Sequence, residues 1–261
     1  MQIRLSDHFT YRRLLRFTLP SVVTMIIASI YSVVDGLFVS NLVGAMALSA
    51  INIAFPVTMI IGAVGFMLGT GGSALVAKTL GEGKKELANQ YFSMLIYSMI
   101  GIGAVLTILA LLFVRPIMGI AGASDLLMED CVIYGAILLA GSVPFMLQVS
   151  FQNFFVVNEK PILGLVLSIA SGVTNMALDY VFIAVLKMGV AGAALATVMG
   201  YVVGGGIPLL YFAKKRERGL QLVKPKFYGK QLLQAASNDL HALFKISHIT
   251  SEMFKANFQE Q

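Results

Sequence analysis

The sequence is poor in charged residues and in the side chains that usually bind metals. Asp, Glu, Lys and Arg make up only 12% of its 261 residues, about half of the roughly 25% that is usual in soluble domains. This low density excludes a soluble enzyme. A single cysteine, Cys131, excludes an intramolecular disulfide and a cysteine-rich zinc site. The histidines, His8, His241 and His248, lie outside the long apolar runs, which argues against a metal or haem site inside those runs.

Long apolar runs fill residues 1–213, where charged residues are sparse. That stretch holds 19 of the 32 charged residues, about 9% of its length, whereas residues 214–261 hold 13, about 27%. A helix needs roughly 20 apolar residues to cross about 30 Å of hydrocarbon. Six runs reach that length, at about 17–42, 52–77, 91–114, 130–156, 161–186 and 190–213. The sequence therefore predicts an all-α integral membrane protein with a bundle of six transmembrane helices.

The basic residues predict how this bundle is oriented. Lys and Arg are more frequent in cytoplasmic than in external loops. With a cytoplasmic N-terminus, the external side holds Arg115 and Lys187, and the inner side holds twelve basic residues: Arg4, Arg12, Arg13, Arg16, Lys78, Lys84, Lys85, Lys160, Lys214, Lys215, Arg216 and Arg218. We expect a multi-pass protein of the inner (plasma) membrane with both termini in the cytoplasm. The net charge of +6 then reflects topology and attraction to anionic membrane lipid, not nucleic-acid binding.

This orientation divides the chain into three parts. Residues 1–16 form a cytoplasmic segment, residues 17–213 the six-helix lobe, and residues 214–261 a charged cytoplasmic linker and tail.

Two acidic residues lie deep inside the predicted spans. A carboxylate in the middle of a membrane costs about 2.5–3.5 kcal/mol on insertion scales, so it must face protein or water. Asp35 is 18 residues beyond Phe17, and Asp179 is 18 residues beyond Pro161. Because both helices run from inside to outside, the two carboxylates are expected at one level in the outer half of the membrane.

Other polar residues are predicted at a similar depth. Asn175 is one helical turn before Asp179, Thr197 lies in the returning sixth helix, and Tyr134 lies near the outer start of the fourth helix. Their carboxylate, amide and hydroxyl oxygens are suited to Na⁺ or a proton and are poor ligands for soft metals. The alternative is a structural hydrogen-bond network that joins the first, fifth and sixth helices.

A second polar stripe lies near the cytoplasmic end of the fourth helix. Gln148, Gln152 and Asn153 are candidates for a substrate pathway, but such a stripe more often joins helices through hydrogen bonds.

Glycine and proline predict close packing and local bends. Gly62, Gly65, Gly69 and Gly72 give the second helix a face of small residues, which allows another helix to approach closely. Four prolines fall within apolar runs and are expected to act as harmless kinks or as hinges: Pro20, Pro56, Pro144 and Pro208.

Several short motifs, in this order, are similar to a known transporter family. They are Leu19-Pro20, Val34-Asp35-Gly36, Gly81-Glu82-Gly83 with Lys84-Lys85, Asn175 with Asp179, and Gly192-Ala193-Ala194-Leu195-Ala196-Thr197. Together they resemble the multidrug and toxic compound extrusion (MATE) family, in particular its bacterial multidrug-export branch, over about residues 10–237.

The resemblance implies a transporter and not an enzyme. It implies an antiporter that exports small organic cations in exchange for inward Na⁺ or H⁺, without a further cofactor. It also implies that the family's cation-binding cluster maps onto Asp35, Asn175, Asp179 and Thr197, with Tyr134 nearby.

The chain departs from the family pattern after its first six helices. The family has two six-helix lobes, and only one is present here. Residues 224–238 resemble the linker between lobes, but the sequence from Asp239 onward does not resemble a seventh helix. We expect a half-length chain that does not transport alone and that acts, if at all, with a second copy or a separately encoded C-terminal lobe.

Three other functions compete with this interpretation. A flippase for lipid-linked precursors would need a groove rich in Lys and Arg, and the predicted spans contain none. A truncated, non-transporting remnant or scaffold would keep the lobe without its activity. An intramembrane enzyme would need a nucleophile with a base, or an HExxH-type ligand set, neither of which is present.

The predicted orientation can be tested with cysteines placed at two loop glycines. Gly83→Cys is expected to react with an impermeant thiol reagent only from the cytoplasmic side, and Gly122→Cys only from outside. Strong labelling of position 83 from outside, with none at position 122, would contradict this topology.

Overall fold

The structure, a computed structural model, describes residues 11–214 and 219–237, and this part of the chain is helical without a strand. The helices are α1 (Tyr11–Leu42), α2 (Ala45–Gly81), α3 (Lys85–Leu112), α4 (Val114–Ile120), α5 (Met128–Ala140), α6 (Ser142–Val157), α7 (Pro161–Asp179), the π-helix η1 (Tyr180–Val185) and α8 (Gly189–Ala213). Residues 1–10, 215–218 and 238–261, on which part of the predicted N-terminal segment and more than half of the predicted tail fall, lie outside the described residues.

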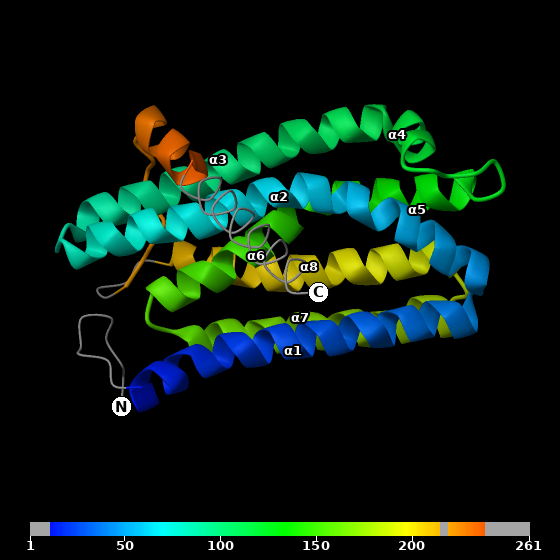
Figure 1. The fold of residues 1–261 in the computed structure, drawn as a ribbon, viewed down its shortest axis with the longest axis horizontal. Helices are drawn as coiled ribbons and strands as arrows, with labels where there is room; N and C mark the ends of the chain where they lie inside the picture. The colour runs from blue at the N-terminus through cyan, green and yellow to red at the C-terminus, as the bar shows by residue number, and fades with distance from the viewer. Residues whose placement is uncertain (1–10, 215–218, 238–261) are drawn as a thin grey trace, which may run out of the picture.

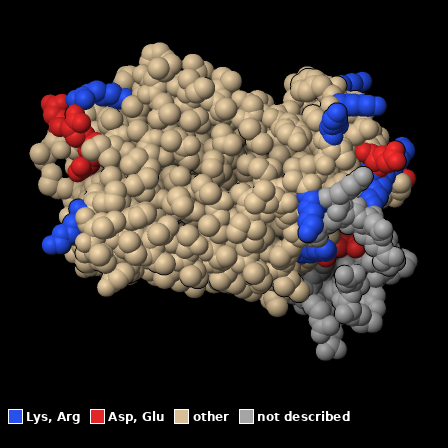
Figure 2. All heavy atoms as spheres, turned by 180° about the vertical axis from the view of Figure 1, so that it is seen from behind, with Lys and Arg blue, Asp and Glu red and all other residues tan. Residues whose placement is uncertain are grey.

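The long helices lie side by side as one bundle (Figure 1). Helix α7 packs mainly against α8 and α1, and α6 packs against α2 and α8. On the face drawn in Figure 2, the charged side chains of the described residues gather at the two ends of the molecule, and the band between these ends is uncharged. We call the end with the α2–α3 turn, which carries Lys78, Lys84 and Lys85, the lysine end.

Among the described residues, α2, α3, α7 with η1, and α8 are each long and apolar enough to cross a membrane. Helices α5 and α6 meet the same test only as a pair, bent by 54°. The predicted runs therefore correspond to α2, α3, α5–α6, α7–η1 and α8, and the first run falls in the 32-residue helix α1, many of whose side chains lie outside the described part. The predicted all-α membrane bundle is confirmed.

The fourth predicted span is broken, which sequence length alone did not indicate. Helix α5 ends at Ala140 and α6 begins at Ser142. Pro144 has no backbone N–H to donate to Ala140, four residues earlier, and its ring crowds that carbonyl. Pro56 and Pro208 lie within helices that continue through them, so of these three prolines only Pro144 coincides with a break.

The small-residue face predicted for α2 is confirmed. A Cβ atom at Gly65 would lie 2.7 Å from the Cα of Met146, and one at Gly69 would lie 2.9 Å from the Cα of Ser150. The Ser150 hydroxyl donates a hydrogen bond of 2.9 Å to the Gly65 carbonyl oxygen. Helix α6 therefore lies against the backbone of α2, at a distance that only glycine permits.

Residues 219–237, which we call the strap, cross the lysine end and bind to it through their backbone. The amide of Leu220 donates to Asn158 Oδ1 (2.8 Å), and the amide of Val223 donates to Ser93 Oγ (2.8 Å). The strap then becomes helical over residues 229–237. Ala235 packs there against Gly71 of α2, where a Cβ atom would collide with the Ala235 carbonyl. The described part of the predicted linker is thus packed on the lobe.

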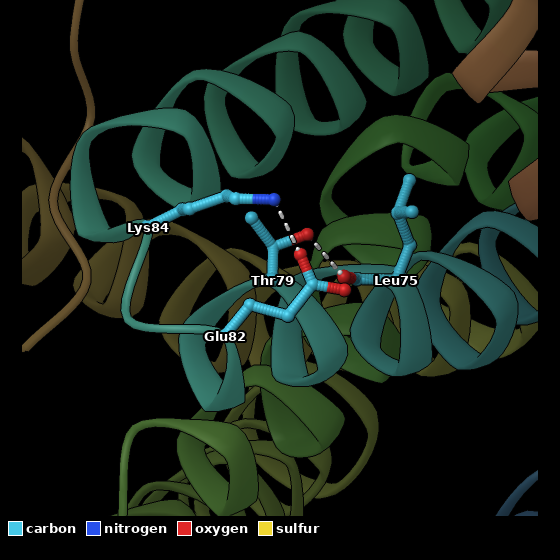
Figure 3. Close-up of polar contacts among 4 residues, drawn as sticks. All are labelled: Leu75, Thr79, Glu82 and Lys84. Atoms are coloured by element: carbon cyan, nitrogen blue, oxygen red, sulfur yellow. Dashed lines mark hydrogen bonds and ion pairs between the residues drawn. The ribbon is translucent and has the colours of Figure 1, made fainter.

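The α2–α3 turn at the lysine end contains the Gly81-Glu82-Gly83 motif. Gly83 has a φ of +76°, which glycine adopts at little cost. Lys84 Nζ donates to Glu82 Oε2 at 2.8 Å, and the hydroxyl of Thr79 donates to the Leu75 carbonyl oxygen at 2.8 Å (Figure 3). The hydrogen bond from Lys84 lowers the pKa of Glu82 and raises the pKa of Lys84. Both groups are exposed, so this pair shapes the turn and adds little stability.

The close contact between α2 and α6 predicts a specific loss of stability. Gly65→Ala would push a methyl group against the backbone of α6 and is expected to lower the free energy of unfolding by about 1–3 kcal/mol. The matched control is Gly101→Ala in α3, where a Cβ atom meets nothing within 4 Å, and we expect it to leave stability unchanged or slightly raised. Thermal unfolding in detergent measures both, and equal melting temperatures for the two variants would contradict close packing at Gly65.

Candidate functional site

The candidate site lies where α7 changes its helical form. Asp179 is the last residue of α7 and is 0% exposed. The next residues, Tyr180–Val185, form the π-helix η1. Short π segments within α-helices are frequent at functional sites, because the wider turn changes the direction in which neighbouring side chains point. A break in the regular helix therefore coincides with the most deeply buried carboxyl group described.

The structure brings the two predicted acidic residues together. Asp35, half-buried on α1, and Asp179 on α7 lie close enough for their carboxyl groups to interact directly. Among the described residues, no donor from another side chain or from the backbone reaches Asp35 Oδ1 or either oxygen of Asp179. The depth argument from helix length correctly placed these side chains at one level, although they come from segments more than 140 residues apart.

Asn175 and Thr197 extend the site along α7 and α8. Asn175 is 4% exposed, and its Nδ2 lies 3.5 Å from Thr197 Oγ1, which is long for a hydrogen bond. The Thr197 hydroxyl donates to the carbonyl oxygen of Ala193 at 3.0 Å. Since the amide nitrogen of Asn175 faces Thr197, its oxygen, Oδ1, is left without a donor.

Tyr134 closes the site from α5. It is 2% exposed and lies within electrostatic range of Asp35, Asp179 and Tyr201. The sequence predicted Tyr134 near this site. Tyr201 of α8 was missed, because an apolar run gives no signal that distinguishes a tyrosine directed inward from one at the lipid surface.

The chemistry of the site is that of a cluster of oxygen acceptors. Four of its buried oxygens meet no donor within the described part of the chain: one from Asp35, one from Asn175 and two from Asp179. Buried polar atoms in native proteins are nearly always partnered, and two facing carboxylates repel one another. The residues present therefore fit a proton or a hard monovalent cation, which carboxylate, amide and hydroxyl oxygens bind well. The described residues contain no cluster of three or more His, Cys, Asp or Glu side chains that could hold a metal ion.

Gln148 and Gln152 lie farther from Asp179 along the bundle, toward the lysine end. Gln148 Nε2 donates to Ser171 Oγ at 3.3 Å, and Gln152 Nε2 lies 3.5 Å from Ser168 Oγ. Both glutamines line a small cavity between α6, α7 and α8, and Asn153 is not among its lining residues. Ser168 and Ser171 were missed from the sequence. Their spacing of three and then four residues to Asn175 was the available signal, because it places all three on the face of α7 that carries Asp179.

A family model described as MatE matches residues 20–181, which is more than half of the chain. This chain belongs to the MatE family. The matched stretch begins within α1 and ends just after Asp179, so it covers most of the helices that form the site. The resemblance inferred from the sequence motifs is confirmed at the level of the family, and this MatE chain is a multi-pass membrane protein.

Curated relatives of this MatE chain carry the name of an exporter. It is 28% identical over 214 residues to the multidrug export protein MepA of Staphylococcus haemolyticus (strain JCSC1435), covering 79% of this chain and 46% of the relative. It is 25% identical over 218 residues to MepA of Staphylococcus aureus (strain MRSA252), covering 82% of this chain and 48% of the relative. The chain thus spans about half the length of the curated relatives it matches.

Solved structures of transporters have the same fold. An outward-facing multidrug resistance MATE family transporter of the MOP superfamily superposes with a TM-score of 0.78 at 26% identity, over 85% of this chain and 49% of that one. A MOP superfamily transporter from Pyrococcus furiosus gives the same TM-score, identity and coverage. The described helices therefore have the fold of one half of these transporters.

Proposed function

We propose that this MatE chain forms one lobe of a cation-coupled multidrug exporter, in which Asp35, Asn175, Asp179 and Thr197 hold the coupling ion. The observation that carries this proposal is the pair of facing carboxyl groups, three of whose oxygens meet no donor from any other described residue. The names of the MepA relatives support drug export as the process. The coupling ion is Na⁺ or H⁺, and the substrates are small organic cations.

The site couples ion binding to helix position through simple electrostatics. Asp35 belongs to α1, whereas Asp179 and Thr197 belong to α7 and α8, which pack against each other. Without a positive charge between them, the two carboxylates push α1 away from α7. A bound cation or proton offsets that repulsion and draws α1 onto α7, while the amide oxygen of Asn175 and the hydroxyl oxygen of Thr197 add neutral ligands.

Export requires a second lobe. Alternating access involves two bundles that rock against each other around a shared site. We infer that this lobe works together with a second six-helix lobe, assembled in the plasma membrane with the lysine end in the cytoplasm. Gln148 and Gln152 contact serines of α7, which supports a helix-joining role over the predicted substrate pathway.

Ion binding is tested by thermal unfolding of the purified chain. We expect Na⁺ to raise the melting temperature in a saturable way at constant ionic strength, because an ion that binds only the folded state stabilises it. The same response to protons, without a response to Na⁺, identifies H⁺ as the ion. Asp179→Asn is expected to abolish the response. The matched control is Asp130→Asn, which alters the first turn of α5 outside the site. A wild-type response that Asp179→Asn leaves intact would refute the assignment of the site.

Export by this chain alone is tested in an efflux-deficient bacterium. We expect cells that express the 261-residue chain to accumulate as much ethidium as cells that express the Asp35→Asn/Asp179→Asn variant, because one bundle has no partner to move against. Membrane insertion of both proteins is verified by immunoblotting. Lower accumulation with the wild-type chain only would show that copies of this chain pair and transport, and would overturn the expectation that it does not act alone.

A further inference from the structure

Helix α7 carries its polar residues on the inward face along much of its length. Ser168, Ser171, Asn175 and Asp179 are all buried and follow one another at intervals of three, four and four residues. The 11-residue separation corresponds to about 16 Å along the helix axis. Large apolar side chains occupy exposed positions on the other side of the helix, namely Val166, Ile169 and Val173. A polar seam therefore runs inside the bundle from the Asp35–Asp179 site toward the lysine end.

The contacts along this seam leave polar atoms in need of partners. The Ser171 hydroxyl donates a short hydrogen bond of 2.7 Å to the Gly200 carbonyl oxygen. By contrast, the contacts from Gln148 and Gln152 to the serines are 3.3 and 3.5 Å long, near the limit for a hydrogen bond. Gln148 is only 8% exposed, and its Oε1 receives no donor from the residues that the structure describes. A buried amide oxygen without a donor commonly marks a bound water.

The seam borders a cavity of the size of one water molecule. The cavity leaves about 10 Å³ for the centre of a water, and its polar lining comes from Gln148, Gln152 and Ser168. One water needs about that room and two to four polar partners. Gly204 lines the same cavity, and a Cβ atom there would lie 2.8 Å from Gln148 Oε1. Because Gly204 has no side chain, the Gln148 amide can lie beside the cavity.

We propose that this cavity holds a water bound by Gln148, Gln152 and Ser168, and that the water and the polar face of α7 form a route inside the lobe from the lysine end to the Asp35–Asp179 site. The route gives the buried carboxyl groups access to the solvent on the side opposite their own end of the bundle. Its role as the path of the coupling ion rests on the proposed function, whereas its permeability to water and small cations does not.

Silver ions test the route directly, because they are small, water-borne and reactive with thiols. In a Cys131→Ser background, single cysteines replace Ser168 and Ser171 on the seam, and Ile169 and Val173 on the opposite face at similar depths. Gly83→Cys identifies the membrane side to which the lysine end is exposed. Silver is added from that side, and the thiols that remain are counted with a fluorescent maleimide after unfolding.

We expect the cysteines at positions 168 and 171 to react at least about tenfold faster than those at 169 and 173, since only a thiol that meets water forms the reactive thiolate. Gly204→Ala should slow the reaction at position 171 several-fold, because its methyl group would displace the Gln148 amide into the cavity. The matched control is Gly206→Ala, whose Cβ atom would come no closer than 4.0 Å to a neighbouring side chain, and we expect it to leave the rate unchanged.

Equal silver rates on the two faces of α7, or equal effects of Gly204→Ala and Gly206→Ala, would overturn the proposed route. These measurements require neither transport nor ion coupling. A fast reaction on the seam, together with a melting temperature that does not respond to Na⁺ or protons, would therefore refute the proposed function and leave the route standing. Slow reaction with an intact ion response would refute the route alone.

Discussion

The close approach of helices at glycine is the constraint on which the rest of the lobe depends. In an apolar medium, hydrophobic attraction between helices is weak, and helix contacts depend on tight packing and on hydrogen bonds across the interface. Gly65 and Gly69 let α6 lie against α2, and Gly200 lets α7 reach the backbone of α8. Only at this separation can short side chains such as Ser150 and Ser171 bond a carbonyl oxygen on the neighbouring helix.

The same packing explains why polar residues can be kept in so apolar a chain. Many large aliphatic side chains face outward, among them Ile60, Val105 and Leu210, while the interior combines large aromatic and aliphatic side chains with small and polar ones. Some inward groups form hydrogen bonds across the helix interfaces, as Ser150 and Ser171 do. The oxygens of Asp35, Asn175 and Asp179, by contrast, form a group that meets no donor among the described residues. A site that binds a cation reversibly must have ligands that the protein itself does not fully satisfy, because a fully satisfied ligand would gain nothing from the ion.

Much of the lobe could be predicted from the sequence, because membrane thickness fixes helix length and length fixes depth. That reasoning correctly placed Asp35 and Asp179 at one level. It could not place the break at Gly141 or the π-helix after Asp179, since both arise from local backbone hydrogen bonding inside an unbroken apolar run. Nor could it find the partners of the strap: Asn158 and Ser93 bind backbone amides 62 and 130 residues away, and no local pattern records such a pairing.

The strap also determines where mechanical load enters this lobe. Residues 219–237 leave α8 and run across the lysine end to the neighbourhood of α2 and α3 (Figure 1), where Tyr228 is held by Gln90 and Tyr91. A force that acts on the chain at residue 237 therefore reaches α2 and α3 first, before it reaches the hydrogen bond that joins the strap to Phe212 of α8. Tension from that direction would act as a lever on α2 and α3, whereas the ion site lies mainly on α1, α7 and α8, so the outgoing chain and the site pull on different helices.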